Sequence, residues 1–396
     1  MKFATKIRWK LRREFSTFFW RVIYLLCLRP VEPLVNWLYD RFSPRLLSFR
    51  KNFQATISER VAVYLLYQPT GVSDVTFGTV ALLKKCGFSV FIVSNAKLMR
   101  NDIDQLSESA DIILERPNYG LDFGGYRDAV LHLKRQQINL SELLLVNDSV
   151  ICSCGDLQAF ISNMQQYSEE AISAVELRGG RGRTPILTSY FLLFRGNFLN
   201  NPSFWRFWCS YQMASSHHTT VRRGERGLSA MIAASGVGFR GMIGSDSRLS
   251  AFLNAADCTD LKLAVRYCAI TDKSLIRDWK NVLSNKENFD EIELKRYIIE
   301  FVQTVASRRS VVASFPYLAH VMCKMPIQKK GSTLLQRLAV CRFADAINDG
   351  VVVGINQAVV VEITRLRERY LSDQTINATY SEAVEICGLS TLNTEA

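Results

Sequence analysis

Short apolar segments alternate with segments of helical periodicity from Val61 to Val146, and this alternation restricts the possible fold more than any other feature. Apolar runs of strand length lie at 61–67, 89–94, 112–114 and 143–146. Helical patterns lie between them, at about 75–85, 97–109 and 126–134. Strands that alternate with helices in this way pair mainly in parallel, with helices on both faces of the sheet. The sequence therefore predicts an α/β fold with a mainly parallel central sheet.

A glycine-rich segment follows the third expected strand, at the sheet edge where such folds bind ligands. Gly120, Gly124 and Gly125 lie between a strand and the start of a helix, so the backbone there is able to approach a ligand closely. The spacing fits neither a dinucleotide fingerprint nor a phosphate-binding P-loop. The segment also carries polar side chains that suit ligand binding: Arg116, Asn118, Asp122 and Arg127. We interpret it as one wall of a binding site whose helix N-terminus is able to receive a phosphate.

A second polar cluster follows the fourth strand, where a buried apolar run ends in Asn147, Asp148 and Ser149. The pattern places a carboxylate at the ligand edge of the sheet. Asp148 is then a candidate ligand for a divalent cation that bridges a pyrophosphate, since such cations prefer oxygen ligands. The alternative is a turn in which Asp and Ser only form local hydrogen bonds, and the pattern by itself favours neither.

The first 58 residues hold much of the excess positive charge of a chain whose net charge is +12. Residues 15–28 form an apolar, aromatic-rich stretch that is too short to span a bilayer, which needs about 20 residues. Its apolar residues recur at helical spacing, and a second helix is expected at 34–42. A basic amphipathic helix of this kind suits an anionic membrane surface better than nucleic acid. Docking of the helix on the protein's own core is the alternative.

The chain beyond about residue 250 is expected to be mostly helical, with apolar residues at helical spacing over 289–304, 333–348 and 358–371. A break is expected at Lys329-Lys330-Gly331, and we find no chemical motif in this region. The ten cysteines are too scattered for a four-ligand zinc site. We therefore predict three parts: basic membrane-surface helices over 1–58, a nucleotide-binding domain over 59–248, and a mostly helical region over 249–396.

Three segments resemble a known family. Asn118 to Arg127, Leu145 to Ser149 and Ser189 to Phe194 look like the corresponding motifs of the rhamnan-synthesis protein F family. Members of that family are glycosyltransferase-like bacterial proteins that act in rhamnose-rich and other surface polysaccharides, including lipopolysaccharide. The resemblance covers about residues 60–245. This chain departs from the family at Leu187-Thr188, where a His-Gln pair is usual.

The resemblance implies a GT-A-like fold, in which a Rossmann-type domain binds a nucleotide sugar. Asn147-Asp148-Ser149 would then stand where such enzymes place their metal motif, with Asp148 binding Mg²⁺ or Mn²⁺. The implied substrate-binding residues, besides those flanking Asp148, are Arg116, Asn118, Gly120, Asp122, Gly124, Gly125, Arg127, Ser189 and Tyr190. Glu225 looks like the general base that deprotonates the acceptor hydroxyl.

Together these patterns favour a glycosyltransferase that moves a hexose such as rhamnose from a nucleotide-diphosphate donor. The expected acceptor is a lipid-linked or growing surface polysaccharide. The expected location is the cytoplasmic face of the inner membrane, where the protein binds peripherally to anionic lipid, and no nucleic-acid partner is expected. The alternative function is a non-catalytic, membrane-associated assembly factor that retains a degenerate GT-A fold.

Overall fold

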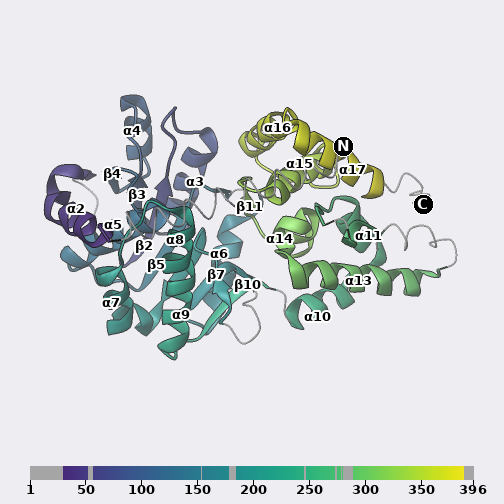
Figure 1. Cartoon of the computed structure of the whole chain (residues 1–396), viewed down its shortest axis with the longest axis horizontal. Coiled ribbons are helices and arrows are strands. Elements are labelled where there is room, and N and C mark those ends of the chain that lie inside the picture. The colour runs from purple at the N-terminus through teal and green to yellow at the C-terminus, as the bar shows by residue number, and fades with distance from the viewer. Residues whose placement is uncertain are drawn as a thin grey trace.

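The computed structural model describes residues 30–51, 57–152, 154–177, 184–244, 247–272, 274–277, 279 and 289–387. A part that contains the sheet and a helical part formed by the later residues lie next to each other (Figure 1). The amphipathic helix expected at 15–28 lies outside the described residues. Within them, no helix is long and apolar enough to cross a membrane.

The predicted strand–helix alternation is confirmed. Strands β2 (Arg60–Leu66), β3 (Ser89–Ser94), β4 (Ile112–Glu115) and β5 (Glu142–Asn147) pair in parallel in the order β4-β3-β2-β5. The helices between them are α3 (Asp74–Lys85), α4 (Arg100–Ser107) and α5 (Leu121–Arg135). Helix α5 begins at Leu121, earlier than the expected start at 126, so most of the glycine-rich segment is helical. The carboxyl ends of the four parallel strands share one edge of the sheet.

The sheet as a whole is mixed, and the expectation of a mainly parallel sheet is wrong for its other half. Strand β9 (Phe191–Arg195) lies between β5 and β7 (Ala171–Leu177) and runs antiparallel to both. Strand β10 (Phe239–Ile243) is parallel to β7, whereas β1 (Ser48–Lys51) and β8 (Ile186–Leu187) pair antiparallel with β4 and β7. Strand β8 is the element between β7 and β9 among the described residues, and strands joined by so short a connection pair antiparallel.

Two apolar layers cover the two faces of the sheet, because successive side chains of each strand point to opposite sides. Ala62, Tyr64 and Leu66 of β2 pack with α3, α4 and α6 (Leu157–Gln166). Val61, Val63 and Leu65 pack on the other face with α5, α7 (Pro202–Ser210) and α9 (Gly227–Ala234). The short elements that connect these helices are η2 (Gly196–Asn200), α8 (His217–Val221) and η3 (Arg222–Arg226), of which η3 is a π-helical turn.

The region beyond residue 246 is helical, as predicted. It comprises α10 (Ser247–Ala255), α11 (Cys258–Arg266), α13 (Glu291–Arg308), α14 (Val311–Ser314), η5 (Leu318–Met322), α15 (Leu334–Asn348), α16 (Gln357–Leu371) and α17 (Gln374–Cys387). Its strand β11 (Gln328–Lys329) pairs antiparallel with β6 (Val150–Ile151), which directly follows the Asn-Asp-Ser cluster. One continuous apolar cluster joins this region to the sheet. The division of the chain at 248 stays a prediction.

Helix α2 (Glu32–Leu46) contains the helix expected at 34–42 and packs beside α5 (Figure 1). Asn36 bonds to both the backbone N–H and the carbonyl of Met213, and the Tyr39 hydroxyl donates to Asp128 at 2.6 Å. These polar bonds fix one side of the helix to the α/β part. The other side exposes apolar residues, among them Leu34 and Trp37.

Candidate functional site

A cavity of about 510 Å³ lies at the carboxyl edge of the parallel strands. Seven of the residues predicted from the sequence line it: Asn118, Asp122, Asn147, Ser149, Ser189, Tyr190 and Glu225. Segments that are far apart in the chain form its walls, namely the ends of β3 and β5, the start of α5, the turn η3 and strand β11. The fold therefore assembles most of the predicted polar residues around one space.

Asp122 and Lys329 belong to one chain of polar contacts across this cavity. Asn147 donates from Nδ2 to Asp122 Oδ2 at 2.8 Å and accepts at Oδ1 from the Ser149 hydroxyl at 2.5 Å. Lys329 Nζ donates to the same hydroxyl at 3.3 Å and lies 4.4 Å from the centre of the Tyr190 ring. The amide of Asn147 thus fixes the direction of the Asp122 carboxylate, while Lys329 faces it from strand β11.

Burial raises the pKa of Asp122 to about 6, and the nearby carboxylates of Asp148 and Glu225 add to the rise, whereas Lys329 opposes it. Burial lowers the pKa of Lys329, and the attraction of Glu225 and Asp122 opposes that change. These mutual effects show that the three charged groups share one poorly solvated space. A carboxylate whose pKa lies near neutrality is well suited to proton transfer.

Glu225 is held at the opposite wall by a π-helical turn, a feature that is frequent at functional sites. Its Oε1 accepts a hydrogen bond from the Ser189 hydroxyl at 2.8 Å and a longer one from the Ser189 backbone N–H at 3.4 Å. The preceding Gly224 packs on Phe123 of α5, where a Cβ atom would lie 2.4 Å from a ring carbon. Only glycine fits there, so the turn carries Glu225 close to the start of α5.

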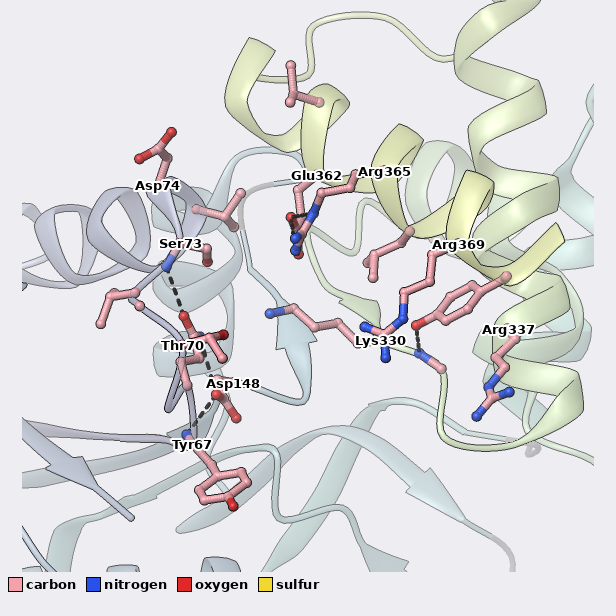
Figure 2. A pocket seen from close by; sticks show the side chains of 18 of the residues that line it. Tyr67, Thr70, Ser73, Asp74, Asp148, Lys330, Arg337, Glu362, Arg365 and Arg369 are labelled. Carbon is pink, nitrogen blue, oxygen red and sulfur yellow. Dashed lines mark hydrogen bonds and ion pairs between the residues drawn. The ribbon is translucent and has the colours of Figure 1, made fainter. Parts of the chain in front are cut away.

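Asp148 faces a second and larger pocket of about 1020 Å³ (Figure 2). Its Oδ2 accepts from the Tyr67 backbone N–H at 2.8 Å and from the Gln68 amide at 3.2 Å. The carboxylate therefore points toward the loop after β2, away from the cavity that holds Asp122 and Glu225. Tyr67 and Lys330 line both spaces, so the two lie next to each other.

The metal site expected at Asp148 has one carboxylate. No group of three or more His, Cys, Asp or Glu side chains in the described part of the chain is placed to hold a metal ion. Magnesium is often bound by one or two carboxylates together with substrate phosphates and water. The donor set at Asp148 thus fits a cation that a bound diphosphate helps to hold.

The predicted arginines Arg116 and Arg127 do not line either pocket. The buried Arg116 guanidinium donates to Asp128 Oδ2 at 2.6 Å, to Asn95 Oδ1 at 2.5 Å and to the Tyr119 carbonyl at 2.6 Å. Arg127 forms a bidentate ion pair with Asp40 of α2, with both contacts at 2.8 Å. Their placement makes them supports of the site: Arg116 orients the start of α5, and Arg127 holds α2.

The three predicted glycines also lie outside the cavity lining, and their role in the structure is close packing. A Cβ atom on Gly125 would lie 2.1 Å from Leu65 Cδ1, and one on Gly124 would lie 2.3 Å from the Tyr119 carbonyl oxygen. Gly120 has a φ of +81° at the start of α5, a conformation that favours glycine. The glycines therefore bring α5 against β2, and this contact positions Asp122.

Strand β11 and the helices after it supply basic residues that the sequence pattern did not reveal. Lys329 lies in the first cavity, and Lys330, Arg337, Arg365 and Arg369 line the second. The only signal was the pair of adjacent lysines, which we interpreted as a break between helices. The two lysines reach the pockets because β11 pairs with β6 and because the Lys330 N–H donates to the Ser149 carbonyl at 2.8 Å.

Comparison with known proteins gives one family and one distant relative. The sequence model described as rhamnan synthesis protein F matches residues 90–342, which is more than half of the chain. The uncharacterized protein y4gN of Sinorhizobium fredii (strain NBRC 101917 / NGR234) is 29% identical over 201 residues, 50% of this chain and 52% of that protein. The chain thus spans about half the length of this curated relative. No solved structure matches the chain.

Proposed function

The chain belongs to the rhamnan synthesis protein F family, and from this premise we propose that it is a glycosyltransferase of polysaccharide synthesis. Its donor is a nucleotide-diphosphate sugar such as one carrying rhamnose, and its acceptor is a lipid-linked or growing glycan. The observation that carries the proposal is the meeting of Asp122, Glu225 and Lys329 in one cavity at the carboxyl edge of parallel strands. In open α/β sheets, ligands bind at this edge.

In the proposed reaction, the acceptor hydroxyl oxygen attacks the anomeric carbon of the donor sugar. The new carbon–oxygen bond forms as the bond from that carbon to the diphosphate oxygen breaks, and the nucleoside diphosphate leaves with the electron pair. Glu225 receives the hydroxyl proton, and its bonds to Ser189 hold it in place for this role. Asp122, fixed by Asn147, binds hydroxyl groups of the sugar from the opposite wall.

The leaving diphosphate carries negative charge that the protein must stabilise. Lys329 lines the cavity that holds Asp122, and Lys330 lines both that cavity and the pocket that Asp148 faces. Both lysines are therefore placed to stabilise the charge of the leaving diphosphate. A Mg²⁺ or Mn²⁺ ion held by Asp148 would supply further charge neutralisation. This part of the proposal uses a GT-A-like arrangement, which the position of Asp148 at the end of β5 supports.

The test is release of nucleoside diphosphate by purified protein given a panel of nucleotide sugars, Mg²⁺ or Mn²⁺, and a membrane lipid extract. We expect Glu225→Gln to lower the rate constant about 10²- to 10⁴-fold, the usual contribution of a general base, with little change in the KM for the donor. The matched control is Glu108→Gln, which should keep full activity. Glu108 is exposed, directly follows the last residue of α4 and lines neither pocket.

Asp148→Asn tests the role of Asp148, and the wild-type donor panel separates the two classes of function. Loss of release in a folded Asp148→Asn protein supports the transferase, whereas normal release argues against a role for Asp148. If folded wild-type protein releases nucleotide from no donor, the transferase proposal fails and the non-catalytic assembly factor takes its place.

We also propose that α2 binds the cytoplasmic face of an anionic membrane. Leu34 is 56% exposed and Trp37 is 60% exposed, and both lie on the side of α2 away from the polar bonds of Asn36 and Tyr39. Exposed apolar residues next to a basic segment are typical of interfacial helices. We expect Trp37→Ser to weaken binding to phosphatidylglycerol vesicles, whereas Ile292→Ser, at an even more exposed apolar residue on α13, should leave it unchanged. Equal binding by both variants and wild type would argue against this surface.

A further inference from the structure

The second pocket has two walls that come from opposite ends of the chain (Figure 2). One wall is the loop that joins β2 to α3, with Tyr67, Thr70 and Ser73, together with Asp148 at the end of β5. The other wall is Lys330 after β11 and one face of α16. Lys330 reaches into the space between these walls (Figure 2). The pocket is therefore open to solvent on one side and has polar and charged groups on both walls.

Four basic side chains line this pocket: Lys330, Arg337, Arg365 and Arg369. Arg365 is paired with Glu362 of the same helix at 2.8 Å. The other three form no ion pair with the described residues. Arg337 packs 5.6 Å from the centre of the Tyr370 ring, and its buried Nε has no hydrogen-bond partner among the described residues. Buried guanidinium groups are normally hydrogen-bonded, so this atom indicates a missing acceptor.

The acidic side chains of the pocket do not neutralise these three. Glu362 is occupied by Arg365, and Asp148 accepts from Tyr67 and Gln68. Asp373 accepts from the backbone N–H groups of Thr375 and Ile376 at the start of α17. The carboxylate of Asp74 is exposed and points away from Lys330 (Figure 2). The lining thus carries four carboxylates beside its four cations, but in the described part of the chain no ion pair joins a carboxylate to Lys330, Arg337 or Arg369, so these three cations are available to an anionic ligand.

The opposite wall presents groups that donate hydrogen bonds. Thr70 and Ser73 offer hydroxyls, and α3 begins at Asp74, so the N-terminal turn of a twelve-residue helix borders the pocket. Ser73 precedes the helix, and its hydroxyl makes no capping bond to the backbone but shares a hydrogen bond with the Thr76 hydroxyl at 3.1 Å. Helix N-termini and arginine side chains are both favourable partners of phosphate oxygens. The two walls therefore suit the same kind of ligand.

We propose that this pocket binds a diphosphate group, held by Lys330, Arg337 and Arg369 on one wall and by the start of α3 on the other. Apolar side chains beside the cations, among them Val361 and Leu366, would contact the organic part of such a ligand. The diphosphate group could belong to the nucleotide donor or to a lipid diphosphate acceptor. The choice of these two molecules rests on the proposed function. Lys330 lines both spaces, so a ligand from either source would lie beside the cavity that Glu225 lines.

The experiment is calorimetric titration of the full chain with inorganic pyrophosphate, without sugar or turnover. We expect Lys330→Ala and Arg369→Ala each to raise the Kd about tenfold or more, as for the loss of one charge-assisted hydrogen bond. Binding should also weaken at higher salt. Arg369 is exposed, so its substitution leaves the fold intact, and circular dichroism checks this for Lys330→Ala. The matched control is Arg206→Ala, an exposed arginine on α7 that lines neither pocket.

A nucleoside diphosphate and a short isoprenyl diphosphate, each titrated into the same variants, distinguish the sources. Tighter binding of either one, lost in Lys330→Ala, supports the proposal and identifies the organic part. Unchanged pyrophosphate binding in the Lys330→Ala, Arg369→Ala double variant overturns it, as does an equal loss in Arg206→Ala. Because no turnover is measured, pyrophosphate binding by a protein that transfers no sugar refutes the proposed function alone. Normal transfer without pyrophosphate binding refutes the pocket alone.

Discussion

Replacing Asp122 by asparagine is expected to make the folded protein more stable at neutral pH. Burial in a poorly solvated cavity raises the pKa of Asp122 from 3.8 to about 6, and the nearby carboxylates of Asp148 and Glu225 add to the rise. At pH 7 the side chain is nevertheless ionised, so its charge is less favourable in the folded chain than in the unfolded one. Asparagine keeps an oxygen that is able to accept the hydrogen bond from Asn147 and removes the charge.

The size of the effect follows from the change in pKa. A change of one in pKa corresponds to about 1.36 kcal/mol, so the difference between 3.8 and about 6 gives about 3 kcal/mol as an upper limit. The folded pKa is the higher one, so the favourable contribution of Asp122 is fully present below pH 3.8 and is lost as the pH rises through about 6. The stability gained by Asp122→Asn should therefore be largest above pH 6 and fall to about 1 kcal/mol at pH 4.5.

The assay is urea unfolding of wild type and Asp122→Asn between pH 4.5 and pH 8, with the free energy of unfolding compared at each pH. Asp104→Asn, an exposed aspartate on α4, is the matched control and should stay within about 0.5 kcal/mol of wild type throughout. If Asp122→Asn is less stable than wild type at pH 8, or if the difference in free energy of unfolding does not change with pH, then the pKa of Asp122 is not raised in the folded protein and the reasoning is refuted.

Two further predictions concern the supports of the site, and both are measured by urea unfolding at pH 7. Arg116→Ala should lower the free energy of unfolding by about 3–5 kcal/mol, because it leaves the buried Asp128 carboxylate with only a long contact of 3.9 Å to Arg127; a loss below about 1 kcal/mol would contradict a structural role. Gly125→Ala should be destabilising by about 1–3 kcal/mol, since the added Cβ overlaps Leu65. Gly78→Ala is its control: no atom lies within 4 Å of the added Cβ on α3, so it should stabilise by about 0.5–1 kcal/mol. Equal effects of the two glycine substitutions would mean that α5 is able to move away from β2.

Local periodicity was sufficient to predict the four parallel strands β2 to β5 and about half of the α-helices in the described part of the chain. The runs at 89–94 and 112–114 became β3 and β4 with little change in their bounds, and the helices at 333–348 and 358–371 became α15 and α16. These predictions succeeded because each element has its own apolar pattern, which depends on no other part of the chain. The start of α5 was missed, since Gly124 and Gly125 are poor helix formers that the packing against Leu65 nevertheless holds in a helix.

The candidate site was predictable only where its residues follow strand ends. Asp122, Asn147 and Ser149 come directly after or near parallel strands, whose carboxyl ends must share an edge, so their meeting in one cavity could be expected. Which side chains face the cavity was not predictable. Arg116 and Asn118 are neighbours in a polar segment, yet the first is buried among Asp128 and Asn95 while the second lines the cavity.

The sequence by itself thus determined the longer helices, the parallel half of the sheet and the carboxylates at its edge, because these depend on short-range patterns. Only the tertiary structure decided the antiparallel position of β9, the supporting roles of Arg116 and Arg127, and the arrival of Lys329 and Lys330 at the site. The physical reason is that a lysine in β11 gains its partners from a pairing with β6, nearly 180 residues earlier in the chain. No local pattern records such a contact; it follows from the packing of the whole chain.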